Sequence, residues 1–447
     1  MVQRKYVAAI LLSGINLLLI TGIFQSCAFK IQRHFLQEQD LMQEVDEGNP
    51  SAKRSPCSKN TSYRPDTNRI GDIPMRHVRL NFHIVQDPKR AHTFNRKLGR
   101  SYVKILANKA NKHIRNNRKM MLPEGNNTPV LPLRFQYRLT GRSGDPADDG
   151  IYFHEDEKLW RFVKKGKHRT IFRKKVYNRY GERKGDVINI FLLEHPPDSV
   201  ASPNYKASQD GVGFPGFVKI AGCYQHLNKD QIKSDGTLKQ STPVLSKLLN
   251  HELGHTLGIS HTWNMDDGCN DTPRNPGCWD PYGDPPCDEK PTTNNVMDYN
   301  YKQNAYTPCQ IGKMQKNFAS LGSSQRQKLR STWCQYKSDS TVFVGAFENV
   351  VWEGHKDLEG DIIINNQGSL TIKCRVHMPG DAKIIVKPKA ELVLEGATIT
   401  NLCGDQWQGI EVWETKRNAP VISISNDASL KNLKHPYRSD KKERAGK

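Results

Sequence analysis

Residues 251–261 read HELGHTLGISH and place three histidines, a glutamate and a glycine at fixed intervals. Residues four apart share one face of an α-helix, so His251 and His255 would direct their imidazoles to a common point. Zn²⁺ takes such nitrogen ligands at about 2.0–2.1 Å, and a catalytic site keeps one position open for water. Zinc lowers the pKa of that water to about 7, so the adjacent Glu252 can take its proton. The segment predicts a hydrolytic zinc site.

The third ligand requires a break in this helix. Gly258 can adopt the left-handed conformation that ends a helix, which lets the chain turn and bring His261 back to the metal. The start of the helix is predicted at Thr242, a suitable N-cap, with Pro243 in the first helical position. The helix would then run to about Leu257.

Downstream, the stretch NNVMDYN at 294–300 supplies Met297 and Tyr299. A pattern HExxHxxGxxH followed by a methionine turn resembles the metzincin metallopeptidases. The resemblance implies that Met297 forms an apolar support beneath the three imidazoles. It also implies that Tyr299 lies beside the metal, where its hydroxyl can donate a hydrogen bond to the oxyanion of the tetrahedral intermediate.

Two further stretches narrow the resemblance to the pappalysin family, cytophagalysins included: HTWNMDDGCNDTP after the third histidine, and NVMDYNYKQNAYTPCQIGKM. The resemblance extends over about 76–335 and is strongest from 245 to 316. It implies an α/β (α+β) catalytic domain with a mixed twisted sheet and the zinc helix at the floor of a cleft. It also implies structural Ca²⁺ in the loop after the third ligand, with the candidate ligands Asp266, Asp267, Asp271, Asp280, Asp284 and Asp288.

The same loop is bracketed by four cysteines, which allow three connectivities: Cys269, Cys278, Cys287 and Cys309. The family's crossed arrangement implies the bridges Cys269–Cys287 and Cys278–Cys309. Further candidate bridges are Cys374–Cys403 and Cys223–Cys334. Cys57 then remains, and we hypothesise that its thiolate occupies the open position of zinc and keeps a zymogen latent.

The N-terminus has the features of an export signal over residues 1–27. Arg4 and Lys5 precede an apolar run from Val7 to Phe24, with an uncleaved anchor as the alternative. Cys27 follows a small residue, as in a bacterial lipoprotein cleavage site. The protein is therefore expected to be secreted, or held at the outer surface as a lipoprotein through Cys27, in a compartment where disulfides form.

Changes in composition divide the rest of the chain. Residues 28–75 are polar and predict a linker or pro-segment, and residues 76–338 form the catalytic domain. Strands are predicted at 76–86, 131–140, 186–194 and 216–222, and a helix at 100–116. The apolar run 186–194 should be central and the short segment 216–222 an edge strand. The tail, 426–447, is basic and predicted to be disordered.

Residues 339–425 form an all-β module. Ile362 and Ile384, and likewise Leu370 and Leu392, are 22 residues apart and are separated by turn residues. A fixed period of short strands predicts a β-solenoid or a small sandwich.

The net charge of +21 favours acidic partners. The densest basic stretch, 158–184, contains aromatic residues, but no zinc-finger, RNP or helix-turn-helix pattern accompanies it. We therefore expect a solvated basic loop and no specific nucleic acid. Contact with an anionic cell surface or a polysaccharide, and membrane attachment through the N-terminus, are further partners consistent with the charge and the export signal.

Together these features predict a secreted or surface-attached zinc metalloendopeptidase that acts on protein or peptide substrates, with Glu252 as general base and acid. The alternative is a surface adhesion or glycan-binding protein in which the C-terminal β module is the functional part and the zinc domain is degenerate. Degenerate peptidases usually lose the base or a ligand, and here all of them are present.

Overall fold

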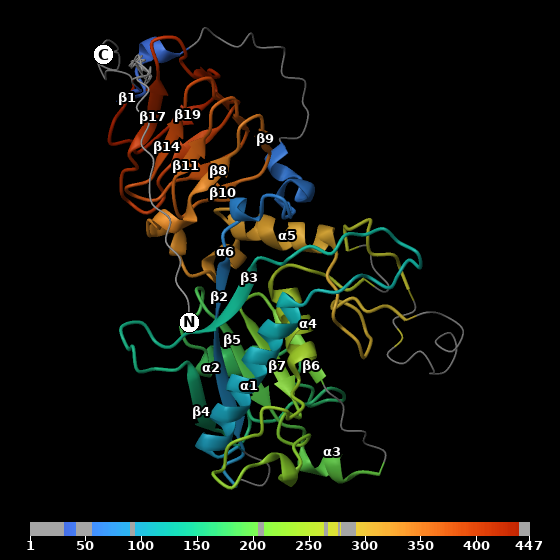
Figure 1. Ribbon diagram of the computed structural model, residues 1–447. Coiled ribbons are helices and arrows are strands. Elements are labelled where there is room, and N and C mark those ends of the chain that lie inside the picture. The colour runs from blue at the N-terminus through green and yellow to red at the C-terminus, as the bar shows by residue number, and fades with distance from the viewer. Residues whose placement is uncertain are drawn as a thin grey trace, which may run out of the picture.

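The computed structural model describes residues 31–41, 56–89, 94–203, 210–262, 267–275, 278 and 292–437. The predicted signal segment 1–27, with Cys27, lies outside these ranges. Two units are visible, a mixed helical and stranded unit and a purely stranded one (Figure 1). Within the ranges given, no helix combines the length and the apolar character needed to cross a membrane.

The first unit is built on a six-stranded sheet. Its strands, in the order β3-β2-β5-β7-β6 with β4 also paired to β2, are β3 (Phe135–Leu139), β2 (Arg76–Gln86), β5 (Ile188–Leu193), β7 (Phe217–Ala221), β6 (Asp210–Phe214) and β4 (Ile151–Glu155). All pairs are parallel except β6–β7. Every residue of β5 is buried, as its apolar run predicts for a central strand.

The edge strand differs from the prediction. Strand β7 pairs on both sides, and β6 forms the edge instead. Strand β6 has the sequence DGVGF, and its two glycines give it none of the apolar alternation by which strands are recognised.

Two long helices cover one face of the sheet: α1 (Arg96–Arg115) and α4 (Ser246–Thr256). Leu249 and Leu253 of α4 share a core with Val218 and Ile220 of β7. The remaining helices are α2 (Lys175–Tyr180), α3 (Pro197–Ala201), α5 (Pro308–Ala319) and α6 (Ser324–Gln327). In Figure 1, α5 and α6 lie between this sheet and the stranded unit.

Helix α4 begins later than predicted. Its N-cap is Leu245, which makes no side-chain capping bond, so Thr242 and Pro243 precede the helix. The amide of Ser246 donates to the carbonyl of Val244 at 2.7 Å, a tight turn that separates Pro243 from the first helical residue. Thr242 is held instead through its carbonyl, which accepts from Lys109 Nζ at 2.7 Å.

The second unit, here called the three-sheet module (residues 342–437), has three parallel sheets through which the chain passes in turn. The sheets contain β8 (Val342–Val344), β11 (Ile362–Ile364), β14 (Lys383–Val386) and β17 (Gly409–Glu414); β9 (Asn349–Trp352), β12 (Ser369–Ile372), β15 (Glu391–Leu394) and β18 (Val421–Ile424); and β10 (Lys356–Asp357), β13 (Val376–His377), β16 (Thr398–Thr400) and β19 (Ser429–Leu430). The predicted partners Ile362 and Ile384 are in register, as are Leu370 and Leu392. The 22-residue spacing therefore marks neighbouring strands that share one apolar core.

Segments near both ends of the described chain contribute to this module. Strand β1 (Gln32–Phe35) pairs antiparallel with β17, and Leu41 bridges to Ile422. Short 3-10 turns at Pro56–Ser58, Asn60–Tyr63 and Ile70–Asp72 follow. The described parts of the predicted linker are thus built into the fold. The predicted disordered tail is ordered as far as Tyr437, because β19 and the bridge Trp407↔Leu433 belong to the last turn; residues 438–447 lie outside the described ranges.

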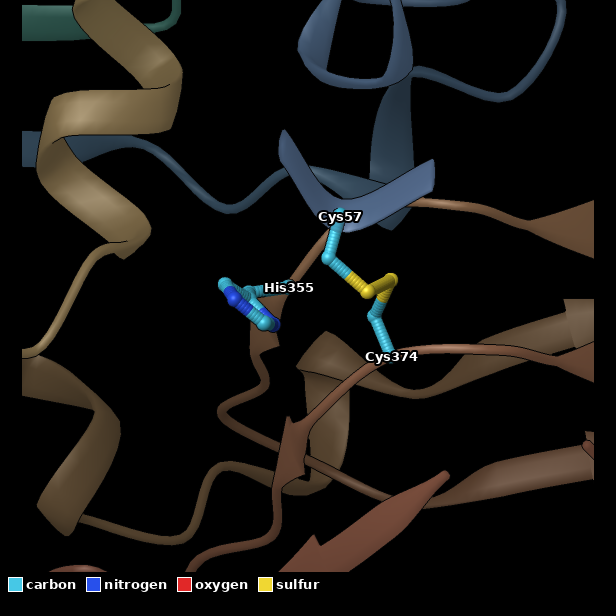
Figure 2. A group of neighbouring side chains, drawn as sticks. All are labelled: Cys57, His355 and Cys374. Carbon is cyan, nitrogen blue, oxygen red and sulfur yellow. A yellow bond between two sulfur atoms is a disulfide. The ribbon is translucent and has the colours of Figure 1, made fainter. Parts of the chain in front are cut away.

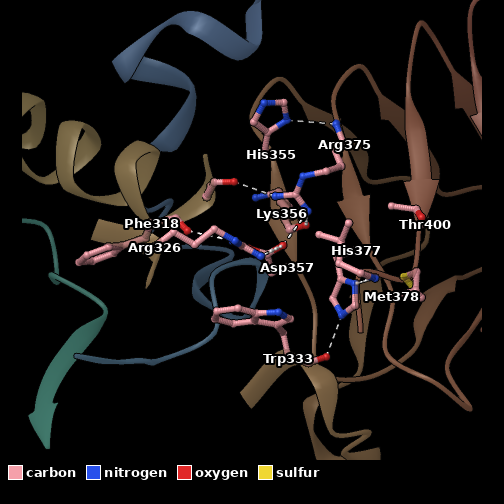
Figure 3. A network of polar contacts seen from close by, with 12 residues as sticks. Phe318, Arg326, Trp333, His355, Lys356, Asp357, Arg375, His377, Met378 and Thr400 are labelled. Carbon is pink, nitrogen blue, oxygen red and sulfur yellow. Dashed lines mark hydrogen bonds and ion pairs between the residues drawn. The ribbon is translucent and has the colours of Figure 1, made fainter. Parts of the chain in front are cut away.

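A buried ionic group joins the two units; we call it the Asp357 cluster, made of Arg76, Arg326, Asp357, Glu359 and Arg375. Figure 3 shows three of its members, Arg326, Asp357 and Arg375. Arg375 Nη1 lies 2.6 Å and Arg326 Nη2 3.1 Å from Asp357 Oδ1. Arg76 contacts Asp357 at 4.0 Å and Glu359 at 3.9 Å. Burial alone would raise the pKa of Asp357, but the charges of Arg375 and Arg326 hold it below its usual range.

Candidate metal centre

The three histidines converge on one point. Their Nε2 atoms are 3.3 Å apart between His251 and His255, and 3.1 Å from each of these to His261. Ligand nitrogens at about 2.0–2.1 Å from a tetrahedral zinc ion lie roughly 3.3–3.4 Å from one another. The triad therefore fits a zinc ion with little rearrangement.

Hydrogen bonds to the Nδ1 atoms fix the histidine tautomer that a metal requires. Nδ1 of His251 lies 2.7 Å from the carbonyl oxygen of Val296, and Nδ1 of His255 lies 2.9 Å from that of Ile259. A carbonyl only accepts, so each Nδ1 carries the proton and each Nε2 presents a lone pair to the common point. Burial, with the neighbouring imidazoles, lowers the pKa of His251 to about 3 and of His261 to about 4, which keeps both rings neutral at pH 7.

The turn after α4 brings in the third histidine. Gly258 has φ +94°, the left-handed conformation that was predicted to end the helix. Asn317 Nδ2 donates to the carbonyl of Leu257 at 3.0 Å and lies 2.5 Å from the position of a Cβ on Gly258. Both the conformation and the space at this position require glycine.

Glu252 is buried beneath the edge strand β6. A Cβ on Gly211 would stand 2.5 Å from Glu252 Oε1, and one on Gly213 would stand 2.3 Å from the Glu252 carbonyl oxygen. The glycines thus let β6 lie directly on α4. Burial raises the pKa of Glu252 to about 8, with the Gly213 amide opposing the rise and the charge of Asp210 adding to it.

These β6 residues were not predicted to belong to the site. The signal that could have identified them is the alternation of glycine in DGVGF, which indicates close approach by another chain segment. Asp210 also contacts Lys164 Nζ at 2.5 Å and His195 at 3.8 Å.

Met297 and Tyr299 both lie at the triad. Met297 is fully buried, and its sulfur would be 2.2 Å from a Cβ on Gly254, so α4 rests directly on this methionine. The ring centroid of Tyr299 is 5.1 Å from that of His261 and 5.9 Å from that of His251. Tyr299 remains 44% exposed, so its ring is open to a ligand in the site.

A pair of amides fixes the turn that carries Met297. Asn295 Nδ2 donates to Gln310 Oε1 at 2.9 Å, and Gln310 Nε2 donates to Asn295 Oδ1 at 3.1 Å. Gln310 also completes a capping box with Thr307 at the start of α5. The NxMDY turn and the TPxQ helix start are therefore two halves of one structure, a connection that the sequence motifs alone did not indicate.

The cysteine pairing in the loop differs from the family's crossed arrangement. Cys269 bonds Cys309, with Cα atoms 5.6 Å apart, so both Cys269–Cys287 and Cys278–Cys309 are wrong. Cys309 opens α5, where its amide donates to Asp271 Oδ2 at 3.0 Å and places its sulfur beside Cys269. Cys278 is also disulfide-bonded, and Cys287 lies outside the described residues.

The latency hypothesis for Cys57 is also contradicted. Cys57 forms a disulfide with Cys374, so it offers no thiolate to zinc (Figure 2). Its turn lies against the three-sheet module, beside His355. Cys334 bonds Cys403, and Cys223 is a buried free thiol, so the other two expected bridges are likewise wrong. Sequence spacing could not reveal these bridges, because two of them join the peptidase region to the module.

Of the candidate calcium ligands, only Asp267 and Asp271 lie in the described residues. Asp267 Oδ1 accepts from the amide of Cys269 and the hydroxyl of Thr272, while burial raises the pKa of its carboxyl group. Each of the two aspartates has one buried oxygen without a hydrogen-bond partner among the described residues. Calcium stays a prediction; the other candidates lie outside those residues, namely Asp266, Asp280, Asp284 and Asp288.

Residues 235–319 match the Peptidase_M43 family model, described as pregnancy-associated plasma protein-A. The match includes the triad, Met297 and Tyr299, and it confirms the predicted resemblance of this segment to M43-like metzincin metallopeptidases. A search of curated proteins found no match.

Solved structures of mirolysin are similar to part of the chain. Mature Tannerella forsythia mirolysin with a cleaved peptide is 20% identical, with a TM-score of 0.36 over 56% of this chain and 94% of that one. A T. forsythia promirolysin variant is 18% identical, with a TM-score of 0.37 over 57% and 84%. Mirolysin in complex with a compound is 18% identical, with a TM-score of 0.38 over 57% and 96%.

Proposed function

We propose that the protein is a zinc-dependent endopeptidase. The observation that carries this proposal is the convergence of three Nε2 atoms, which lie 3.1–3.3 Å apart. Backbone carbonyls hold two of the rings, His251 and His255, in the tautomer whose Nε2 can bind a metal. His251, His255 and His261 would hold the zinc ion. The intact base Glu252 favours this function over an adhesion protein with a degenerate zinc domain.

Zinc, when bound, lowers the pKa of a water molecule and polarises a carbonyl group. The protein's own groups do the rest. The positive charge of a bound zinc ion would oppose the effect of burial on the pKa of Glu252 and favour its carboxylate form. As a carboxylate shielded from solvent by β6, Glu252 takes the proton of the attacking water and later delivers it to the leaving amine. The Tyr299 hydroxyl donates a hydrogen bond to the oxygen on which negative charge develops.

The substrate would bind as an extended strand along β6. Strand β6 pairs with β7 on one side and with no other described strand, so its outer edge can form main-chain hydrogen bonds with a peptide. An open edge imposes no terminus on the peptide, which is the basis for proposing an endopeptidase.

Two further expectations accompany this proposal. We infer that the protein is exported, because three bridges join described cysteines to one another, and such bridges persist in an oxidising compartment. We also infer that the three-sheet module is a β-solenoid, since four turns of chain each add one strand to every sheet.

The test is cleavage of a mixed peptide library by the full-length protein. Glu252→Gln should abolish cleavage while bound zinc, measured by mass spectrometry, stays at the wild-type level. A chelator should also stop cleavage, and added zinc should restore it. The matched control is Glu395→Gln, which makes the same change at an exposed glutamate of the module. Cleavage that survives both the chelator and Glu252→Gln would exclude the mechanism.

A further inference from the structure

A cavity of about 760 Å³ lies on the face of the sheet opposite the histidine triad. Lys219 of β7 lines it, whereas Val218 and Ile220 of the same strand pack with Leu249 of α4. Neighbouring side chains of a strand point to opposite faces, so the cavity and the zinc helix are separated by the sheet itself. The cavity's outer wall is the basic stretch 158–184, for which the proposed peptidase mechanism has no use.

The lining is strongly cationic. Six basic residues contribute to it: Lys158, Arg161, Arg173, Lys175, Arg179 and Lys219. Its one acid, Asp156, is already engaged by the Tyr180 hydroxyl at 2.9 Å and by Arg179 at 3.2 Å. Four of these basic residues form no ion pair with a carboxylate in the described part of the chain: Lys158, Arg161, Arg173 and Lys175. Four charges thus remain available to a ligand.

The floor of the cavity is a built structure. The side chain of Lys219 is only 2% exposed, and its Nζ donates to the carbonyls of Thr170 (2.8 Å) and Arg173 (3.0 Å). These two bonds hold the basic loop over the sheet and fix the backbone at Arg173. Trp160 and Phe162, both buried beside it, anchor the start of the loop.

The chemistry of the lining favours a compact anion over nucleic acid. Single-stranded nucleic acid needs exposed aromatic faces for stacking. Here Tyr177 stacks on Phe217 and Tyr180 on His154, so these rings are already used. Phe172 is 57% exposed, but it does not line the cavity. The volume lies in the range of small-molecule sites, about 300–1,000 Å³.

We propose that this cavity binds a compact molecule bearing several sulfate or phosphate groups, with Arg161 and Arg173 as its principal anchors. A guanidinium donates two parallel hydrogen bonds to such an oxyanion, a geometry that lysine does not offer. The site would act as a second binding site on the enzyme, and its existence does not depend on the peptidase function.

Calorimetric titration of the full-length protein at roughly 0.15 M salt tests the proposal. The probes are a fully sulfated disaccharide, inositol hexakisphosphate, the unsulfated disaccharide and a single-stranded RNA oligomer. The variant Arg161→Gln/Arg173→Gln should bind the charged small probe at least about tenfold more weakly, because it removes both charge-assisted pairs with the oxyanion. The control Lys104→Gln/Lys112→Gln loses the same charge from exposed positions on α1, on the other face of the sheet.

Tighter binding of either the sulfated sugar or the inositol phosphate identifies the source of the oxyanion, and both outcomes support the site. The unsulfated disaccharide should not bind. The proposal is overturned if neither charged probe binds, if the control weakens binding as much as the arginine variant, or if RNA binds more tightly and is lost in that variant. Unchanged cleavage of a short peptide by the arginine variant would show that the zinc site is intact.

Discussion

Tyr299 and Tyr301 provide a natural comparison at the scale of single residues. Both side chains are 44% exposed and stand two positions apart. Only Tyr299 has its ring beside two of the three histidines, at 5.1 and 5.9 Å between centroids. The first tyrosine should therefore act on the substrate, whereas the second should not.

Tyr299→Phe should lower kcat by about 10²–10³-fold, because it removes one donor to the developing oxyanion and keeps the ring. Bound zinc and the unfolding midpoint should stay at their wild-type values. Steady-state kinetics on a peptide substrate measures the effect, with Tyr301→Phe as the control. Equal kcat values in the two variants would contradict the role of Tyr299.

The residues of the triad could be predicted from the sequence because their spacing is local: the helix aligns His251 with His255, and the glycine turn at Gly258 returns His261. Met297 and Tyr299 followed from the motif resemblance. Asp210, Gly211 and Gly213 were missed because they reach Glu252 only through the packing of β6 on α4. The predictions of the cysteine pairs failed because the pairing also depends on contacts between distant segments. Cys57 and Cys374, for example, are 317 residues apart in the sequence.

At the scale of elements, a polar group is buried among strands β2, β4 and β5. His83 Nδ1 lies 2.9 Å from His154 Nε2, and His83 Nε2 lies 2.9 Å from Asn189 Oδ1. Burial, together with the neighbouring imidazole, lowers the pKa of His83 to about 3, and burial lowers that of His154 to about 4. Both fall below the usual value of 6.5, so the folded protein keeps the rings neutral.

The free energy of unfolding should fall as the pH drops from about 6.5 towards 3. In that range the two histidines bind protons in the unfolded chain but not in the folded one. Above about pH 6.5 these histidines are neutral in both the folded and the unfolded chain, so they no longer make stability depend on pH. His83→Gln should reduce the loss in the urea midpoint between about pH 7.5 and pH 5, while the exposed His168→Gln should not. An identical pH slope in His83→Gln and the wild type would refute the assignment.

The elements themselves were predictable to differing degrees. The bounds of β2 match the alternating segment 76–86, and the 22-residue period identified true strand partners. The start of α4 was misplaced because the tight turn at Val244 overrides a good local capping sequence. Strand β6 was not predicted, because its glycines allow close contact with Glu252 and do not form the apolar pattern of a core strand.

At the scale of the whole molecule, the Asp357 cluster holds the peptidase unit against the first turn of the three-sheet module. Asp357 is 1% exposed and lies among three arginines. The disulfides Cys57–Cys374 and Cys334–Cys403 reinforce the same boundary. The two units are therefore expected to unfold as one.

Asp357→Asn should destabilise the protein by about 3–5 kcal/mol, because it leaves buried arginine charges without their carboxylate. Thermal unfolding should then separate into two transitions, one for each unit. Differential scanning calorimetry measures this, and the exposed Asp339→Asn should keep the wild-type profile. A single transition at the wild-type temperature in Asp357→Asn would show that the cluster does not couple the units.

The pairing of β1 with β17 has a consequence for the order of folding. Gln32 opposes Glu414, a separation of 414 − 32 = 382 residues. Contacts between such distant positions form slowly, since the chain between them must first be brought into place. During synthesis, β1 is made before the module and can find its partner only when β17 exists. Until then the edge of β17 has no strand to cover it, so we expect the β1–β17 pairing to be among the last contacts of the described chain to form.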